Sequence, residues 1–365
     1  MTTSSSGFTP LGWTKRILVQ PSTLLPLAAV LAAVTIGGVV ILAMGVAPGK
    51  ALAAFSTGAF GSPYAIAVSI NRAVIFALIG LGFILANRAN LTNVGGEGQI
   101  AVGGIAATAV ALYGGVDGFG FGLAIILPML AATVSGAVWG GIAGLLRVRA
   151  GTNEVISTLL LSFIAIWLVY WCVQSEDLLR QPMTTSATLP ESAEIPISTQ
   201  LPLLTGDYSS PVTVGLPIAL ILALIGAVVL RSSRFGFNLR VVGLNSVAAA
   251  RAGIAQRSTI VWALTIAGAF GGLAGAIMLL GEQYSLKTGF SSGYGFDGLV
   301  VGLLARGSVV GVLAGALLFG FLRSGGIGME MGAAVPSAVV SVIQGLIVVF
   351  VAGAAFWLDR KEKAR

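Results

Sequence analysis

Three carboxylates stand inside or beside long apolar runs of this sequence: Glu97, Glu154 and Asp297. An acid in a hydrocarbon layer is costly, and such residues usually face a bundle interior or a wet cavity. Glu97 lies in the segment ANLTNVGGEGQIAVGG, which five glycines interrupt. Backbone freed by such a break is tolerated at depth only where protein or water satisfies it. The segment therefore predicts either a broken helix that lines a polar pathway or a cytoplasmic turn whose Glu97 caps the next helix.

The other two acids also begin apolar segments. Asn153 and Glu154 precede VISTLLLSFIAIW, where Ser157, Thr158 and Ser162 recur on one helical face. These hydroxyls either face a site or bond back to their own helix, and the residues alone favour the second. Asp297 begins an eight-residue apolar stretch that ends before Arg306. Eight residues cover only ~12 Å as a helix, so we expect a half-helix, as in transport sites.

The sequence offers little for enzyme chemistry. GFSSG at 289–293 matches the G-x-S-x-G pattern of hydrolases, but the chain has no histidine to act as the base. No G-x-x-x-x-G-K-[ST] phosphate loop occurs, so ATP hydrolysis would need another chain. A single cysteine, Cys172, allows no internal disulfide, and without histidine the usual metal constellations are missing. We expect neither an enzyme nor a bound cofactor or metal.

Composition defines the solvent of this chain. Of its 365 residues, 56% are hydrophobic and only 9% are charged, and the mean hydropathy is +0.97. Soluble proteins have about 25% charged residues, so we expect lipid to cover most of the surface of this chain. Long charge-free runs reach the ~20 residues of a spanning helix. We expect an all-α polytopic membrane protein of about ten helices, some broken or half-length. They lie near 24–47, 65–88, 98–114, 120–146, 154–173, 214–231, 258–281, 297–305, 308–323 and 336–356.

The distribution of basic residues predicts the orientation. Most of the twenty lysines and arginines fall on one side of this helix order, and the positive-inside rule makes that side cytoplasmic. The tails 1–23 and 357–365 are then both cytoplasmic, and 24–356 forms one transmembrane domain. The net charge of +7 is read as a topology signal, so no nucleic acid is expected as a partner.

Two polar segments separate the predicted spans. Residues 174–212 lie outside in this topology, as either an ordered cap or a loose loop. Residues 232–257 lie inside and contain NSVAAARAG. Its Asn245 as N-cap and Gly253 as C-cap predict a short surface helix over 245–252.

The chain also contains a faint internal repeat, in which 144–169 resembles 320–349 around a Leu-Arg turn. The two copies would be inverted, as in many transporters, although such similarity also arises by chance in sequence this rich in Gly, Ala and Leu. Small residues four apart favour close helix packing within one subunit over a subunit interface. They are Gly136, Gly140 and Gly144; Gly271 and Gly275; and Gly311 and Gly315.

Five ordered blocks over roughly 65–355 resemble the membrane permeases of ABC importers for branched-chain amino acids, simple sugars and nucleosides. They are NVGGEGQIAVGG, GTNEVISTLLLSFIA, NLRVVGLNSVAAARAGI, GFDGLVVGLLARGSVVGVLAGALLFGFLRSG and VPSAVVSVIQGLIVVF. The N-x-G-x-E-G-Q and N-E-V-I-S-T blocks are most similar to the nucleoside subgroup and to its larger permease. The resemblance implies a bacterial plasma-membrane permease paired with a second, non-identical permease. It also implies a cytoplasmic ABC ATPase and an extracytoplasmic substrate-binding protein or lipoprotein as partners.

The resemblance also implies roles for single residues. The cytoplasmic coupling segment of the family is matched at Gly243, Asn245, Ala248, Ala249 and Gly253, with Ser246 in place of the usual proline, and Arg251 within it is also expected to contact the ATPase. Ser162 stands where relatives often have asparagine. The predicted substrate pathway comprises Asn93, Glu97, Gln99, Asn153, Glu154, Thr158, Ser162, Phe296, Asp297 and Gln344. Amides and carboxylates suit the hydroxyls and base edges of neutral nucleosides, and Phe296 or Phe163 offers stacking or simple packing.

Two other functions stay open from sequence. One is a permease for a simple sugar or a branched-chain amino acid in the same superfamily. The other is an ion-coupled secondary transporter, which also uses inverted repeats and buried carboxylates. A docking helix over 245–252 distinguishes the importer, because a secondary transporter has no use for one.

Overall fold

The computed structural model describes residues 21–120, 122–183, 189–336, 338–346, 349–350 and 353. These residues form helices, short irregular segments and three isolated β-bridges, with no β-strand among them. They divide into two compact units, one of residues 60–324 and one of residues 1–59 with 325–365. The all-α prediction is therefore confirmed for the described part of the chain.

Six described helices are long and apolar enough to cross a membrane. They are α4 (Pro63–Asn87), α6 (Leu123–Ala150), α7 (Glu154–Gln174), α8 (Gly215–Ser232), α11 with the π-helical turn η3 (Gln256–Gln283), and α13 (Val309–Ala333). Two further helices, bent by 116° at a short break, could form a seventh span. The chain is thus a multi-pass membrane protein, while a total of about ten spans stays a prediction.

The bent pair lies where the sequence predicts one span over 24–47. The structure instead has α2 (Pro21–Ala43) and α3 (Pro48–Phe60). Gly45 adopts a φ of +80° between them, and a proline at the first helical position favours a new start at Pro48. The apolar run continues through this turn, which is why hydropathy alone did not reveal it.

The last two predicted helices also differ from expectation. The helix expected over 308–323 is α13, which continues ten residues further to Ala333. Arg323 therefore lies in a helix interior, and the second Leu-Arg turn of the suggested repeat is absent there. The inverted repeat itself stays a prediction. Residues 338–346 of the helix expected over 336–356 are helical, and most of its remainder lies outside the described residues.

In the larger unit, α4 is the most buried span and packs against α8, α11 and α12 (Tyr294–Leu304). The helices α6 and α11 meet through glycines. A Cβ at Gly136 would lie 2.4 Å from the carbonyl oxygen of Gly268, and one at Gly272 would lie 2.0 Å from that of Ala132. Only glycine allows this backbone approach. These glycines pack helices together within one subunit, which is the alternative that their spacing favours.

The segment expected outside is ordered where the structure describes it. Ser192, Ile195 and Leu201 donate backbone hydrogen bonds to the carbonyls of Leu286, Tyr284 and Leu280. Ile195 and Leu201 are buried. Of the two alternatives left open for 174–212, the structure favours a cap on the end of α11, apart from residues 184–188, which are not described.

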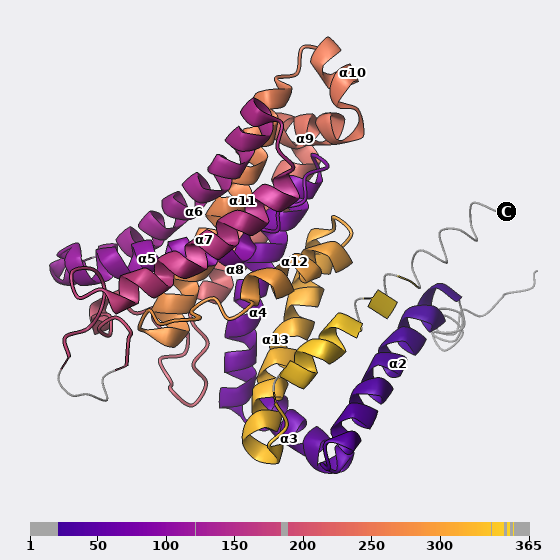
Figure 1. Cartoon of the computed structure of the whole chain (residues 1–365), viewed down its shortest axis with the longest axis vertical. Helices are drawn as coiled ribbons and strands as arrows, with labels where there is room; N and C mark the ends of the chain where they lie inside the picture. Colours follow the sequence, from indigo (N-terminus) through magenta and orange to yellow (C-terminus); the bar gives the residue numbers. More distant parts are fainter. Residues whose placement is uncertain are drawn as a thin grey trace, which may run out of the picture. The chain divides into compact units, whose positions relative to one another are not determined.

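Two short helices replace the predicted polar loop 232–257. The first, α9 (Arg234–Leu244), was missed by the sequence analysis, and the second, α10 (Ser246–Arg251), was predicted. Asn245 caps α10 by accepting a hydrogen bond from the amide of Ala248 at 3.0 Å, and Gly253 follows it with a φ of +78°. The predicted N-cap is confirmed, whereas the C-cap is Ala252 and the left-handed Gly253 is the residue after it. In Figure 1, α9 and α10 lie together at one end of the larger unit.

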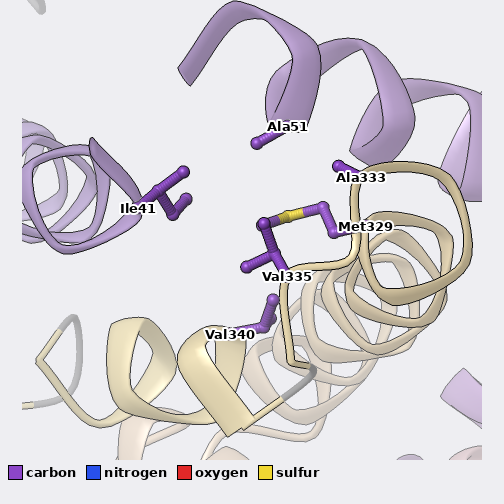
Figure 2. Close-up of a cluster of buried hydrophobic side chains, with 6 residues drawn as sticks. All are labelled: Ile41, Ala51, Met329, Ala333, Val335 and Val340. Atoms are coloured by element: carbon purple, nitrogen blue, oxygen red, sulfur yellow. The ribbon is translucent and has the colours of Figure 1, made fainter. Parts of the chain in front are cut away.

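The smaller unit has its own apolar cluster, drawn in Figure 2, whose side chains come from α2, α3, the end of α13 and the segment after it. Its buried members are Ile41, Ala51, Met329, Ala333, Val335 and Val340. Glycine allows close contact here too, because a Cβ at Gly328 would lie 2.7 Å from the carbonyl oxygen of Ala54. Packing of α3 on α13 thus stabilises the bend after α2.

Candidate functional site

Glu97 links two helices that are distant in sequence. It lies in the first turn of α5 (Gly96–Tyr113) and is 3% exposed. Its two carboxylate oxygens each accept one backbone hydrogen bond at 2.8 Å, from the amides of Gly293 and Gly295. These amides belong to the start of α12, where free donors and the helix dipole favour an anion. Glu97 thus caps α12, not the helix that it begins.

Close backbone contact accompanies this cap. A Cβ at Gly295 would lie 2.0 Å from the amide nitrogen of Glu97. The beginnings of α5 and α12 therefore touch backbone to backbone, and any side chain at Gly295 would separate them.

The loop before α5 is held by a pair of amide side chains. The Nδ2 of Asn93 donates to Gln99 Oε1 at 3.1 Å, and the Nε2 of Gln99 donates to Asn93 Oδ1 at 3.2 Å. The amide of Gly95 also donates to Asn93 Oδ1, at 2.9 Å. Both side chains are buried. A buried amide is tolerated because its polar atoms are paired.

Two hydroxyls of α7 hold the same loop from the other side. Thr158 accepts a hydrogen bond from the amide of Val94 at 3.1 Å, and Ser162 accepts one from the amide of Gly98 at 3.3 Å. Each hydroxyl also donates to a carbonyl of its own helix, that of Glu154 or Thr158. The back-bonding predicted for these residues is confirmed, and the tertiary bonds are additional. We call Asn93, Glu97, Gln99, Thr158 and Ser162 the polar junction.

Two arginines that were not predicted as site residues, Arg72 and Arg323, continue the network. Arg72 of α4 lies 3.1 Å from Glu282 of η3 and donates to Ser324 of α13 at 2.9 Å. Arg323 of α13 donates to the carbonyl of Ser292 at 2.9 Å.

Arg323 also lies over the ring of Tyr294, 5.1 Å from its centroid. That ring stacks on Phe76 of α4 at 4.9 Å. Glu97 and Arg323 thus hold the start of α12 from α5 and α13 with opposite charges. Arg72 and Arg323 each lie inside an apolar helix. A charge within an apolar run, the signal that singled out the three acids, therefore also indicates these arginines.

The remaining predicted pathway residues do not join the junction. Asn153 is exposed, and its side chain caps α7 by accepting from Val155 and Ile156. Glu154 pairs with Arg147 of α6 at 3.3 Å. Gln344 is buried in the smaller unit, where its Nε2 has no hydrogen-bond partner among the described residues.

Phe296 and Asp297 are half-buried in the first turn of α12. They are the predicted residues nearest in sequence to the bonds that hold α12. A role for them in substrate binding stays a prediction.

The predicted coupling residues divide into a buried and an exposed set. Ala249 is fully buried, whereas Ala248 and Arg251 are exposed. Val247 of α10 is 61% exposed, and Leu244, the last residue of α9, is 88% exposed. Residues spaced by three and four share one helical face. On α10 (Ser246–Arg251) this face is formed by Val247, Ala248 and Arg251, and it is called the α10 face below.

The α10 segment is attached to α4 without an intervening side chain. A Cβ at Gly243 would lie 2.3 Å from the carbonyl oxygen of Arg88 and 3.1 Å from the Cα of Ala89. The predicted coupling glycine is thus a point of direct backbone contact between α9 and the end of α4.

Several apolar spans, a half-length helix held by buried charges, and an exposed helix pair at one end are features of a membrane transport protein. The chain belongs to the family described as branched-chain amino acid transport system / permease component, whose model matches residues 65–352. No solved structure shows significant similarity to it.

Three curated relatives cover most of the chain. A glucose ABC transporter permease of Haloferax volcanii is 34% identical over 91% of this chain and 87% of its own length. A guanosine ABC transporter permease of Bacillus subtilis is 34% identical over 90% of this chain and 92% of its own. A nucleoside ABC transporter permease of Lactococcus lactis subsp. cremoris is 31% identical over 90% of both chains.

Proposed function

We propose that this chain is the membrane-spanning subunit of a bacterial ABC importer, with ATP hydrolysis carried out by separate cytoplasmic subunits that dock on α10. The α10 face carries this proposal. It exposes two apolar side chains and one arginine on a helix too short to span a membrane. An exposed apolar patch with a charge at its edge is typical of a protein-binding surface.

Ala248→Trp tests the docking directly. The side chain is exposed, so tryptophan fits the isolated chain but blocks a partner that approaches this face. We expect co-purification of the ATPase subunit to be lost while the thermal stability of the chain is unchanged. Ala150→Trp, at an exposed alanine at the end of α6, is the matched control. Wild-type ATPase recovery with Ala248→Trp would overturn the proposal.

Ala249 does not serve this purpose. It lies on the buried side of α10 and is fully buried. A bulky side chain there would overpack the fold and lower the free energy of unfolding by about 1–3 kcal/mol. Loss of transport in an Ala249 variant would therefore say nothing about docking.

We further propose that the transported solute is a nucleoside, delivered by an extracytoplasmic binding protein, and that a second, non-identical permease completes the pathway. The guanosine and nucleoside permeases among the relatives support the substrate, and the N-E-V-I-S-T block supports the larger-permease role. The glucose permease of equal identity makes a simple sugar the second candidate. Uptake of labelled uridine or adenosine in competition with unlabelled glucose separates the two. Inhibition by glucose, but not by unlabelled nucleosides, would refute the nucleoside proposal.

The proposed orientation places the termini and α10 in the cytoplasm. Two highly exposed positions test it in a Cys172→Ser background: Leu244→Cys beside α10 and Tyr208→Cys in the polar segment 174–212, which are 88% and 84% exposed in the native chain. An impermeant maleimide added to intact cells is expected to label the cysteine at 208 only. Labelling of the cysteine at 244 alone would reverse the topology.

A further inference from the structure

A basic cavity lies at the end of the larger unit that carries α9 and α10. Its volume is about 370 Å³, and three arginines line it: Arg88 after α4, Arg231 in the last turn of α8, and Arg240 of α9. The described residues that line it include no acid. The cavity therefore concentrates positive charge that nothing in its own wall neutralises.

Two further features of this cavity suit an anion. The Nη2 of Arg88 donates to the carbonyl of Gly307 at 2.9 Å, which fixes the guanidinium. Its Nε is buried without a hydrogen-bond partner among the described residues. Val309 and Val310, in the first turn of the 25-residue α13, also line the cavity. Amides at a helix start lack intrahelical partners and bind phosphate-like oxygens readily.

An apolar groove lies further along three of the helices that reach the cavity, α4, α8 and α13. Residues of α4, α8 and α13 line it, all of them apolar, in a volume of about 190 Å³. On α13 the groove begins at Leu313, one turn beyond Val309 and Val310. On α8 and α4 the groove begins at Leu220 and Ala77, each of which is 11 residues, or ~16 Å, from the cavity arginine of its own helix segment. This length matches the ~15 Å of hydrocarbon in one leaflet.

We propose that this surface binds one anionic phospholipid. Its phosphate lies at Arg88, Arg231 and Arg240, and one acyl chain runs along α4, α8 and α13 until its end reaches the groove. Basic pockets between transmembrane helices at the cytoplasmic side bind anionic head groups in this way. A groove lined only by apolar side chains favours a lipid over an acidic protein segment. The ATPase contact is assigned to a different surface, the α10 face.

Photo-crosslinking tests the proposal on the full chain. The chain is reconstituted in phosphatidylcholine nanodiscs that contain a small fraction of phosphatidylglycerol with a photoreactive acyl chain. We expect crosslinks to Leu220, Leu313 and their neighbours in the groove. Arg231→Gln with Arg240→Gln is expected to reduce them about 30-fold, since each arginine near a membrane surface contributes several-fold to binding. Both side chains are exposed, so the fold should tolerate the change.

The matched control removes two exposed arginines outside the cavity, Arg149→Gln with Arg257→Gln, and should leave the crosslinks unchanged. Three results would overturn the proposal. Equal crosslinking by photoreactive phosphatidylcholine would show that charge is not recognised. Binding of inorganic phosphate that depends on these arginines, without acyl crosslinks, would identify a free-phosphate site. Crosslinks from cysteines placed at 231 and 240 to an ATPase subunit, with none from lipid to the groove, would identify a protein contact.

Discussion

The cap of Glu97 on α12 gives a quantitative prediction. Both carboxylate oxygens accept backbone amides at 2.8 Å, from Gly293 and Gly295, and the side chain is 3% exposed. In Glu97→Gln one oxygen becomes an NH₂ group, which faces an amide donor instead of accepting from it. The other oxygen still accepts, but as a neutral group.

The expected cost follows from the two bonds. A hydrogen bond to a charged group contributes about 1.5–3 kcal/mol, and a neutral one about 1 kcal/mol. Losing one charged bond and converting the other to a neutral one therefore costs about 2–5 kcal/mol. For a unit of this size that corresponds to a fall in Tm of roughly 4–10 °C.

The assay is thermal unfolding of the purified chain in one detergent. Asp297→Asn is the control, because it removes a half-buried carboxylate from the same turn of α12 and leaves the bonds of Glu97 in place. We expect a clearly smaller loss for Asp297→Asn than for Glu97→Gln. Equal Tm values for Glu97→Gln and the wild type would show that the carboxylate does not hold α12.

Two further predictions concern contacts of α4, one near its middle at Arg72 and one at its end at Arg88. Glu282→Gln leaves Arg72, whose side chain is 14% exposed, without its ionic partner and should cost about 1–3 kcal/mol, measured by thermal unfolding. Adding Arg72→Met should recover part of this loss, and a purely additive double variant would contradict the pairing. Gly243→Ala places a Cβ 2.3 Å from the carbonyl oxygen of Arg88, so we expect the ATPase to remain bound while transport falls at least tenfold. Gly226→Ala, where a Cβ meets open space in the single chain, should transport normally, and equal transport by both variants would show that this contact is not needed.

Much of the local structure could be predicted from sequence. Asn245 and Gly253 delimit α10 because capping depends on residues within one turn of each other. The spans followed from charge-free runs of sufficient length. In contrast, α9 was missed because RFGFNLRVVGL has neither a long apolar run nor a strong cap signal.

The partners of the buried polar residues could not be predicted. Glu97 binds backbone amides that lie 196 and 198 residues away, and a backbone amide has no sequence signature. The sequence showed that Glu97 needed a partner and that glycines allowed close approach. It did not show that Gly295 supplied both the amide and the space.

The structure also changes the meaning of the predicted pathway residues. Within the single chain, Asn93 and Gln99 pair with each other, and Glu97 is fully engaged with α12. These side chains hold the helix starts in place, and they are so deeply buried that a solute would contact them only after a change of conformation. Groups that remain partly exposed can contact a solute without a change in the packing of the helices. Phe296 and Asp297 are such groups.

These contacts give α4 a central mechanical position. One end touches the α9–α10 pair at Gly243, backbone against backbone, so no flexible side chain can absorb a displacement there. Near the middle of the helix, Arg72 binds Glu282 and Ser324, and Phe76 stacks on Tyr294 at the start of α12. The distance from Arg72 to Arg88 along the helix is ~24 Å, and packed neighbours cover most of it. A helix so enclosed moves as a rigid body more readily than it bends, because interiors packed this closely transmit strain. Movement of α10 by a docked ATPase would therefore reach α12 through α4, and Gly243→Ala acts at the first contact of that route.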